Sequence, residues 1–204
     1  MTFYAGPSVV EAVREFLEDG THGGTGSPAT TLNGELTTTR TALSIVDGDG
    51  TDGTPVTLPD IKEFHDWISP GPHASSFPHM SIEWVGHGGE YDPSSGRGFE
   101  HQIRLVTYVP IAVVAPSSAR DEAQAAAYAV ALYDLTLCTV LYRDSSTGST
   151  QGKGLNDGGT GRAQGKIRRS TVTGSSVAVA GDSGSPALAL ITDLTVVTSE
   201  PYRA

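Results

Sequence analysis

The stretch that most constrains the fold is SSARDEAQAAAYAVALYDLTLCTVLYRD, residues 117–144. Ser117 or Ser118 can cap a helix, and acidic side chains follow in what would be its first turn. Seven alanines lie between residues 119 and 131, and alanine has the highest helix propensity of the amino acids. The sequence therefore predicts one long helix with a slim face that can lie close against a sheet. An apolar stripe extends along this helix through Val130, Tyr133, Leu137 and Leu141.

A shorter helix is predicted over residues 7–19, PSVVEAVREFLED. Pro7 and Ser8 suit its first turn, and Gly20 is a residue type that commonly ends a helix. Apolar side chains recur at the i, i+3, i+4 and i+7 positions, which share one face of a helix. The residues of this face are Val9, Val10, Val13, Phe16 and Leu17.

The other ordered stretches have the composition or the alternation of β-strands. Residues 35–46 are rich in threonine and other β-branched side chains, which favour extended structure. An Asp/Gly-rich turn separates them from a short returning strand. Farther along, alternation of apolar and polar residues predicts an antiparallel hairpin with a long tip, and two more strands close the chain. The predicted strands are 35–46, 55–59, 79–85, 99–114, 170–180 and 187–199.

Together these elements predict an α+β protein, with a mostly antiparallel sheet packed by one long Ala-rich helix and a short N-terminal helix. The 25 glycines and 12 prolines indicate many turns, and long Gly-rich loops are expected at about 20–34 and 144–169. The sequence contains no recognisable internal repeat or second-domain boundary. The chain of 204 residues is therefore interpreted as a single structural domain, residues 1–204, with two loop insertions.

Charge and composition argue against several classes of protein. A net charge of −10 disfavours non-specific binding to nucleic acid or to anionic lipid. No run approaches the roughly 18 apolar residues of a membrane span, and the N-terminus lacks the basic start and apolar core of a signal peptide. The single cysteine, Cys138, is expected to be a buried apolar side chain and not a reactive thiol. We expect no cofactor and no membrane partner.

The segment 144–169 differs from the rest of the chain in charge. Its five basic and two acidic residues give it a charge near +3, which leaves 8 basic and 21 acidic residues, near −13, elsewhere. Such a Gly-rich segment is either a flexible surface loop or an interaction arm that orders on a partner. As an arm it could dock on the acidic body of the next subunit. The candidate arm residues are Lys153, Arg162, Lys166, Arg168 and Arg169.

The stretch AGDSGSPAL, residues 180–188, resembles the loop around the nucleophilic serine of trypsin-like proteases. A serine nucleophile needs a histidine base, and none of the six histidines lies in the Ala-Ala-His-Cys-like stretch of that family. A long helix in mid-chain also contradicts a fold of two β-barrels, and only 21 residues follow Ser183. The stretch is therefore interpreted as a hairpin turn between two strands. A serine hydrolase that uses Ser183 stays as an alternative function.

Two loops carry side chains of types that can bind a metal ion. The stretch DGDGTDG, residues 47–53, offers carboxylates as calcium loops do, but the EF-hand pattern requires glutamate where this chain has Leu58. His87, Glu90 and Asp92 share a Gly-rich stretch, yet their spacing is not that of a zinc site. We therefore expect no metal. A calcium-dependent binding module is the second alternative function, with ligands Asp47, Asp49 and Asp52.

Two stretches carry a resemblance to a known family: SVVEAVREFLEDG near the start, and HQIRLVTYVPIAVVAPSSARDEAQAAAYAVALYDLTLCTVL. A short amphipathic helix, antiparallel strands, a long Ala-rich helix and closing strands, in this order, resemble the tail-terminator and head–tail joining (neck) proteins of tailed bacteriophages. The resemblance covers about residues 1–20 and 78–143. It is a pattern of elements without a sharp motif.

The resemblance implies a structural virion protein and not an enzyme. Such proteins form homo-oligomeric rings, often hexamers, that cap the tail tube and join it to the head. The implied partners are further copies of the chain, the tail tube protein, and a head-completion or portal-side connector protein. DNA would pass through the lumen without specific binding, and an acidic body suits that passage because like charges repel. The implied location is the tail or neck of the virion, after assembly in the host cytoplasm.

Overall fold

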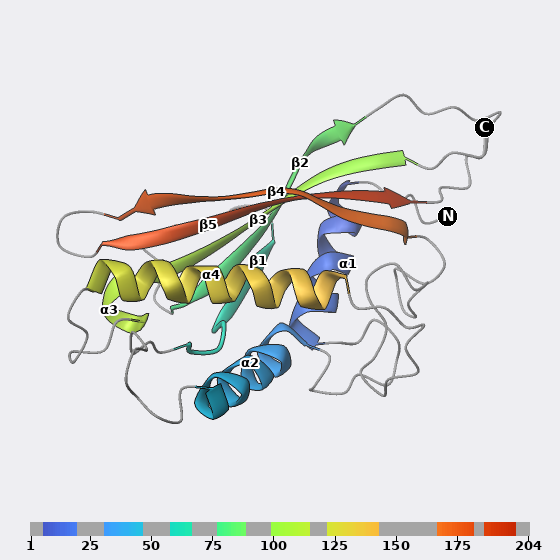
Figure 1. The fold of residues 1–204 in the computed structure, drawn as a ribbon. Helices are drawn as coiled ribbons and strands as arrows, with labels where there is room; N and C mark the ends of the chain where they lie inside the picture. The colour runs from blue at the N-terminus through green and yellow to red at the C-terminus, as the bar shows by residue number, and fades with distance from the viewer. Residues whose placement is uncertain are drawn as a thin grey trace, which may run out of the picture.

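The computed structural model of the protein, shown in Figure 1, describes residues 6–19, 31–46, 58–66, 77–88, 99–114, 122–142, 167–181 and 186–198. Four helices and five strands are formed by these residues. In chain order they are α1 (Gly6–Asp19), α2 (Leu32–Val46), β1 (Glu63–Asp66), β2 (His79–Gly88), β3 (Phe99–Pro110), α3 (Ile111–Val114), α4 (Glu122–Leu141), β4 (Ile167–Ala180) and β5 (Ala187–Thr198).

The five strands form one mixed sheet in the order β1-β2-β3-β5-β4. β1 pairs with β2 in parallel, whereas the pairs β2–β3, β3–β5 and β5–β4 are antiparallel. The α+β class predicted from the sequence is therefore confirmed. The sheet is built from two hairpins, β2–β3 and β4–β5, whose inner strands β3 and β5 pair over their whole length.

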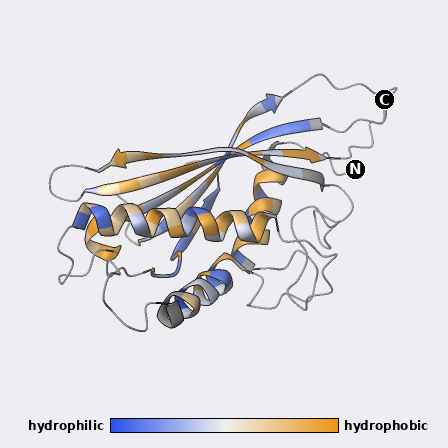
Figure 2. Ribbon diagram, viewed as in Figure 1, coloured by the Kyte–Doolittle hydropathy of each residue, from blue (hydrophilic) through white to orange (hydrophobic). Residues whose placement is uncertain are grey.

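The hydrophobic core lies between the sheet and helices α1, α2 and α4, which all lie on one side of it (Figure 1). Side chains of a strand alternate between the two faces. On β3 and β5 every second residue therefore faces the helices, and Leu105 and Leu190 are at most 2% exposed. All five residues of the apolar face predicted for the first helix are buried in this core. Figure 2 shows the hydrophobic colouring on the side of α1 and along most of α4.

Helix α4 lies within the stretch 117–144, and the four residues of its predicted stripe are buried. By length and composition alone α4 is also apolar enough to cross a membrane. Polar residues such as Gln124 and Asp134 interrupt the apolar residues of α4, so the expectation that no apolar run approaches the length of a membrane span is not contradicted. In the fold, however, 56% of its most apolar window is buried inside the protein, and the core helix of a globular protein passes the same test.

Helix α2 contradicts the strand predicted over residues 35–46. The prediction relied on threonine, whose β-branched side chain lowers helix propensity only slightly, so that tertiary contacts can override it. Thr31 caps the helix, because its hydroxyl accepts a hydrogen bond from the Gly34 amide at 2.9 Å. Leu32 and Leu36 are buried in the core. Several threonines satisfy their hydroxyls within the helix, as in the bond from Thr38 to the Gly34 carbonyl at 3.4 Å.

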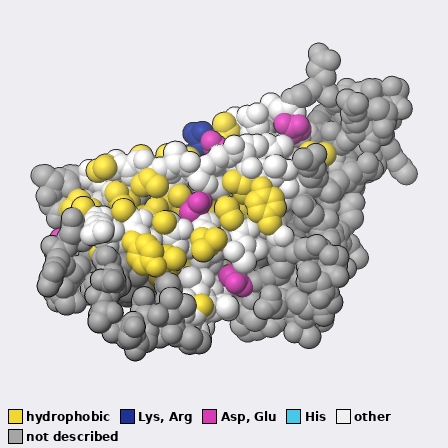
Figure 3. All heavy atoms as spheres, in the orientation of Figure 1, with side chains coloured by type: hydrophobic (Ala, Val, Ile, Leu, Met, Phe, Trp, Pro, Cys, Tyr) yellow, Lys and Arg dark blue, Asp and Glu magenta, His cyan; other side chains and the backbone are white. Residues whose placement is uncertain are grey.

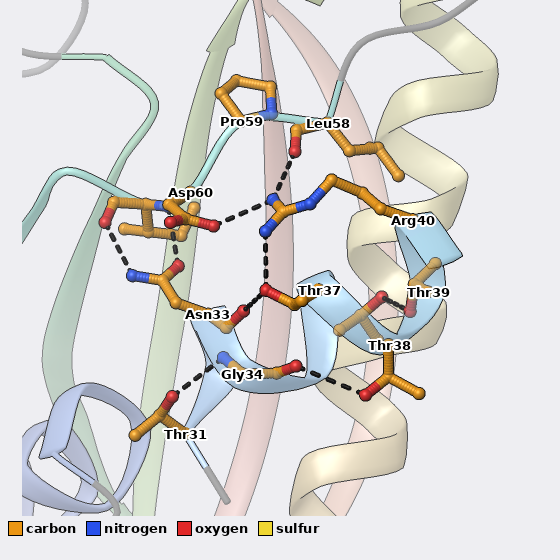
Figure 4. A network of polar contacts seen from close by, with 12 residues as sticks. Thr31, Asn33, Gly34, Thr37, Thr38, Thr39, Arg40, Leu58, Pro59 and Asp60 are labelled. Carbon is orange, nitrogen blue, oxygen red and sulfur yellow. Dashed lines mark hydrogen bonds and ion pairs between the residues drawn. The ribbon is translucent and has the colours of Figure 1, made fainter. Parts of the chain in front are cut away.

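Long side chains of α2 hold it against the segment before β1, as Figure 4 shows. Asn33 uses both ends of its amide on Ile61: its Nδ2 donates to the Ile61 carbonyl at 3.0 Å, and its Oδ1 accepts from the Ile61 amide at 2.8 Å. Arg40 donates to the Leu58 carbonyl at 2.7 Å and pairs with the Asp60 carboxylate at 2.8 Å. These contacts connect residues 18 to 28 positions apart, which periodicity along the chain does not reveal.

Other boundaries also differ from the sequence prediction. The strand expected over 99–114 ends at Pro110, and the next four residues form α3. Proline has no amide hydrogen for the ladder, and the Ile111 amide instead donates to the Pro186 carbonyl at 3.1 Å. Of the short strand expected at 55–59, only Leu58 and Pro59 are described, and neither lies in a strand. The Gly-rich loop expected over 20–34 ends earlier, because α2 begins at Leu32.

Candidate assembly surfaces

A row of charged side chains crosses three strands on the sheet face opposite the helices. Glu83 of β2 pairs in register with Arg104 of β3, which in turn lies opposite Asp193 of β5. Arg104 Nε donates to Asp193 Oδ1 at 2.8 Å, and a second guanidinium nitrogen lies 3.4 Å from Oδ2. The hydrogen bond with Asp193 raises the pKa of Arg104. With the nearby Glu100, this group of four charged side chains has an excess of negative charge.

This charged row borders a hollow of about 360 Å³ on the same face. Its side chains are mostly carboxylate, amide and hydroxyl groups, and its guanidinium is already engaged by a carboxylate. The hollow therefore offers hydrogen bonds, and the described side chains that line it include no unengaged cation and no serine or cysteine nucleophile beside a base. The polar side chains that line it are Glu100, Gln102, Arg104, Thr173, Asp193 and Thr195.

On the helix side of the molecule, large apolar side chains are exposed on α4 and on the edge strand β4. We refer to Tyr128, Leu135, Tyr142, Val177 and Val179 as the α4–β4 surface. Their exposed fractions are 40%, 60%, 49%, 56% and 83%, respectively. Figure 3 shows hydrophobic side chains gathered over α4 and the adjoining part of the sheet. A contiguous apolar surface of this kind is typical of an interaction site.

Two hydrogen-bonded contacts fix α4 beside β4. The Tyr142 hydroxyl accepts a bond from the Val172 amide at 2.6 Å and lies 3.3 Å from the Val172 carbonyl, so one side chain satisfies both backbone groups of an edge residue. Ser175 donates to the Asp134 carboxylate at 2.8 Å. Register shifts interrupt the β4–β5 ladder between Ile167 and Arg169 and again between Val172 and Gly174.

Two of the histidines lie together at one end of the sheet. The rings of His87 on β2 and His101 on β3 have centroids 5.3 Å apart, and His101 Nε2 lies 3.2 Å from the Thr198 hydroxyl. Burial lowers the pKa of His101 to about 4, with a smaller contribution from His87, so the His101 imidazole is neutral at pH 7. No group of three or more metal-ligating side chains occurs among the residues that the structure describes.

The structure places only part of the predicted interaction arm. Arg168 and Arg169 are the second and third residues of β4, which begins at Ile167. The loop expected over 144–169 is therefore shorter at its C-terminal end. Arg169 lies opposite Val197 in the β4–β5 ladder. Lys153, Arg162 and Lys166 lie outside the described residues.

The other candidate sites are placed as follows. The stretch around Ser183 connects β4 to β5, whose terminal residues Ala180 and Ala187 pair directly, although Ser183 itself lies outside the described residues. Cys138 is half-buried on α4, where burial raises the pKa of its thiol. This direction disfavours the reactive thiolate at neutral pH. The remaining candidates lie outside the described residues: Asp47, Asp49, Asp52, Glu90 and Asp92.

The α4–β4 surface was not predicted from the sequence, although one signal for it exists. Tyr128, Leu135 and Tyr142 repeat every seven residues, on a different row of the helix from the buried stripe. Comparison with known proteins adds no further site: no protein-family model matches the chain, and no curated protein is significantly similar to it.

Proposed function

We propose that this chain is a structural virion protein of a tailed phage, a ring-forming tail terminator or head–tail connector that caps the tail tube and joins it to the head. The proposal combines two kinds of support. One is the resemblance to that family in the order of the elements and in their type: a short amphipathic helix, α1, and a strand, β3, that leads to the long Ala-rich helix α4. The other is a sheet face whose chemistry suits contact with moving DNA.

The observation that carries the proposal is the open, polar end of the sheet face opposite the helices. Among the side chains that the structure describes there, Glu83, Glu100 and Asp193 outnumber Arg104, and the guanidinium is held by Asp193. Like charges keep DNA from adhering, so such a face can line a channel through which DNA passes. None of the described residues on this face forms a nucleophile–base pair, so the face favours a structural role over the hydrolase alternative.

In this proposal the molecule is a mostly antiparallel sheet packed by one long Ala-rich helix, α4, and the short α1. The Gly-rich loops expected at about 20–34 and 144–169, shortened by the start of α2 at Leu32 and of β4 at Ile167, extend from the single structural domain, residues 1–204. The loops reach neighbouring subunits, the tail tube protein and a head-completion or portal-side connector protein. The basic segment 144–169, of which residues 167–169 begin β4, docks on the acidic body of the next subunit, because the two carry opposite net charge.

The test is the assembly state of the purified full chain, measured as molar mass by light scattering with negative-stain images of the same fraction. A discrete ring built from several 21.2 kDa subunits is the expected result. A chain that forms no ring, either alone or on tail tubes, would contradict the proposal. Labelling of Ser183 by a fluorophosphonate probe, lost in Ser183→Ala, would instead support the hydrolase.

A charge-reversal variant tests the role of the polar face. Glu83→Lys combined with Glu100→Lys should leave the ring intact but give it a salt-dependent affinity for duplex DNA, which the wild type lacks. Glu122→Lys on α4, compared with Glu83→Lys alone, is the control with an equal change of charge, because this exposed carboxylate lies on a helix and not on the sheet face. Equal DNA binding by the two single variants would show that the position of the charge does not matter, and would count against a DNA channel at this face.

A further inference from the structure

The exposed side of α4 carries a regular apolar seam. Tyr128, Ala131, Leu135, Cys138 and Tyr142 follow one another at alternating steps of three and four residues, which is the spacing of a row along one side of a helix. The buried stripe of α4 lies on another row and packs in the core. A helix that needed only to cover the sheet would have polar residues on its outer row, so this second apolar row requires an explanation.

The seam continues onto the edge strand β4. Tyr142 is bonded to Val172, and Asp134 is bonded to Ser175, so α4 and β4 run in opposite directions. From Asp134 to Tyr142 the helix rises about 12 Å, and from Val172 to Ser175 the strand extends about 10 Å. The two elements therefore lie side by side over this distance. Val177 therefore lies farther toward the N-terminal half of α4.

That half of α4 consists largely of alanines, which are too short to cover a neighbouring strand. Ala127 and Ala131 are themselves exposed. Val177 and Val179 share a face of β4 with Val172 and Ser175, because they lie opposite the core-facing Leu190 and Leu188 of β5. They are nevertheless 56% and 83% exposed. The apolar row of α4 and the valines of β4 therefore form one continuous surface.

The charged residues of α4 and the net charge of the chain indicate which kind of partner the α4–β4 surface can bind. Helix α4 contains no lysine or arginine, and its acidic residues are Glu122, in the first turn, and Asp134, which is bonded to Ser175. Two copies of a chain with net charge −10 repel each other, and they approach at the lowest cost through a surface with few charged side chains. An anionic lipid surface fits less well, because membrane-surface helices carry Lys and Arg beside the apolar face.

We propose that a second copy of this chain docks on the α4–β4 surface through its own α4–β4 surface. An apolar seam with steps of three and four residues packs best against another of the same kind, and a second copy supplies one. The five side chains form a patch on the order of a few hundred Å², which matches the apolar centre of an interface of about 800 Å² per partner. This proposal rests on the self-assembly in the proposed function and assigns one of its contacts.

A contact between two identical surfaces closes on itself as a pair. The proposal therefore predicts an even number of subunits, with which a hexamer is compatible. In a ring-forming protein such a contact joins subunits in pairs within one ring or joins two stacked rings. The contacts that close a ring head to tail would use other surfaces of the chain.

The experiment compares the full chain with Leu135→Asp, Val179→Asp and the milder Leu135→Ser, by sedimentation velocity over a concentration series. Val85→Asp is the matched control, because Val85 is a large apolar residue that is 51% exposed on β2, away from the α4–β4 surface. We expect the wild type to form an even multiple of 21.2 kDa. Each charged variant should weaken pairing by about tenfold or more, and Val85→Asp should leave it unchanged. Circular-dichroism melting of each variant verifies that it is folded.

Several outcomes would overturn the inference. A wild type that stays monomeric at its highest soluble concentration is one, and pairing that survives both charged variants is another. Flotation of the wild type with phosphatidylcholine–phosphatidylglycerol vesicles, lost in Leu135→Asp, would identify the surface as lipid-binding instead. Rings that keep the same number of subunits in the variants as in the wild type would overturn the inference and leave the proposed function intact. Pairs that dissolve in the variants, in a protein that forms no ring, would support the inference and refute the function.

Discussion

Helices α2 and α4 contact each other through the hydroxyls of Thr39 and Thr136, 3.0 Å apart, yet they are stabilised in different ways. Helix α4 consists of strong helix formers and needs only its buried row against the sheet. Helix α2 contains a glycine, an asparagine and a run of threonines, and it depends on contacts with residues 58–61. The difference shows that one helix can form because its residues have high helix propensity, whereas another depends on tertiary contacts made by its side chains.

The largest expected effect that tests this contrast comes from Asn33→Ala. The change removes both hydrogen bonds to Ile61 and leaves a part-buried amide and carbonyl without these partners. Each such group costs about 1–3 kcal/mol when desolvated, so we expect the free energy of unfolding to fall by about 2–3 kcal/mol. Urea denaturation followed by circular dichroism measures the change. If Asn33→Ala were as stable as the wild type, α2 would not depend on its contacts with Ile61, and the contrast with α4 would be wrong.

Arg40→Met should have a smaller effect. The substitution keeps an apolar stem but removes the bond to the Leu58 carbonyl and the ion pair with Asp60. Because the ion pair is about one-third to one-half exposed, we expect a loss of about 1 kcal/mol, mostly from the carbonyl bond. Urea denaturation in low and in high salt separates the two parts. Salt should weaken the wild type more than the variant, and an equal response would show that the ion pair contributes nothing.

Two further substitutions, with effects of at most about 1 kcal/mol, should change stability in opposite directions in the two helices. Thr38→Ala, at an exposed position of α2, should raise stability by about 0.5 kcal/mol, because alanine is the better helix former. Ala127→Gly, at an exposed position of α4, should lower stability by about 1 kcal/mol for the same reason. Thermal melts of the two variants measure both signs. If Thr38→Ala were instead destabilising, the threonine hydroxyls would contribute more to α2 than the bonds within the helix suggest.

Local patterns explain which elements could be predicted from the sequence. The apolar face of α1 and the alternation in β2 and β3 repeat within a few residues, and the folded elements follow them. Helix α2 was predicted as a strand, because its partners at Leu58, Asp60 and Ile61 are distant in sequence. The α4–β4 surface could not be predicted either. Both rows of α4 are apolar, and which of them is exposed depends on how the helix crosses the sheet.

The pairing of β3 with β5 also bears on how the chain folds. Each hairpin, β2–β3 and β4–β5, joins strands that are close in sequence, whereas the central pair brings Pro110 against Ala187 across α4 and its flanking connections. Contacts between distant residues slow folding, so the hairpins should form first and the central pair should join them late. The entropy of closing such a loop grows only with the logarithm of its length, about 0.6 kcal/mol per doubling. The chain between α4 and β4 can therefore be lengthened at little thermodynamic cost to the fold.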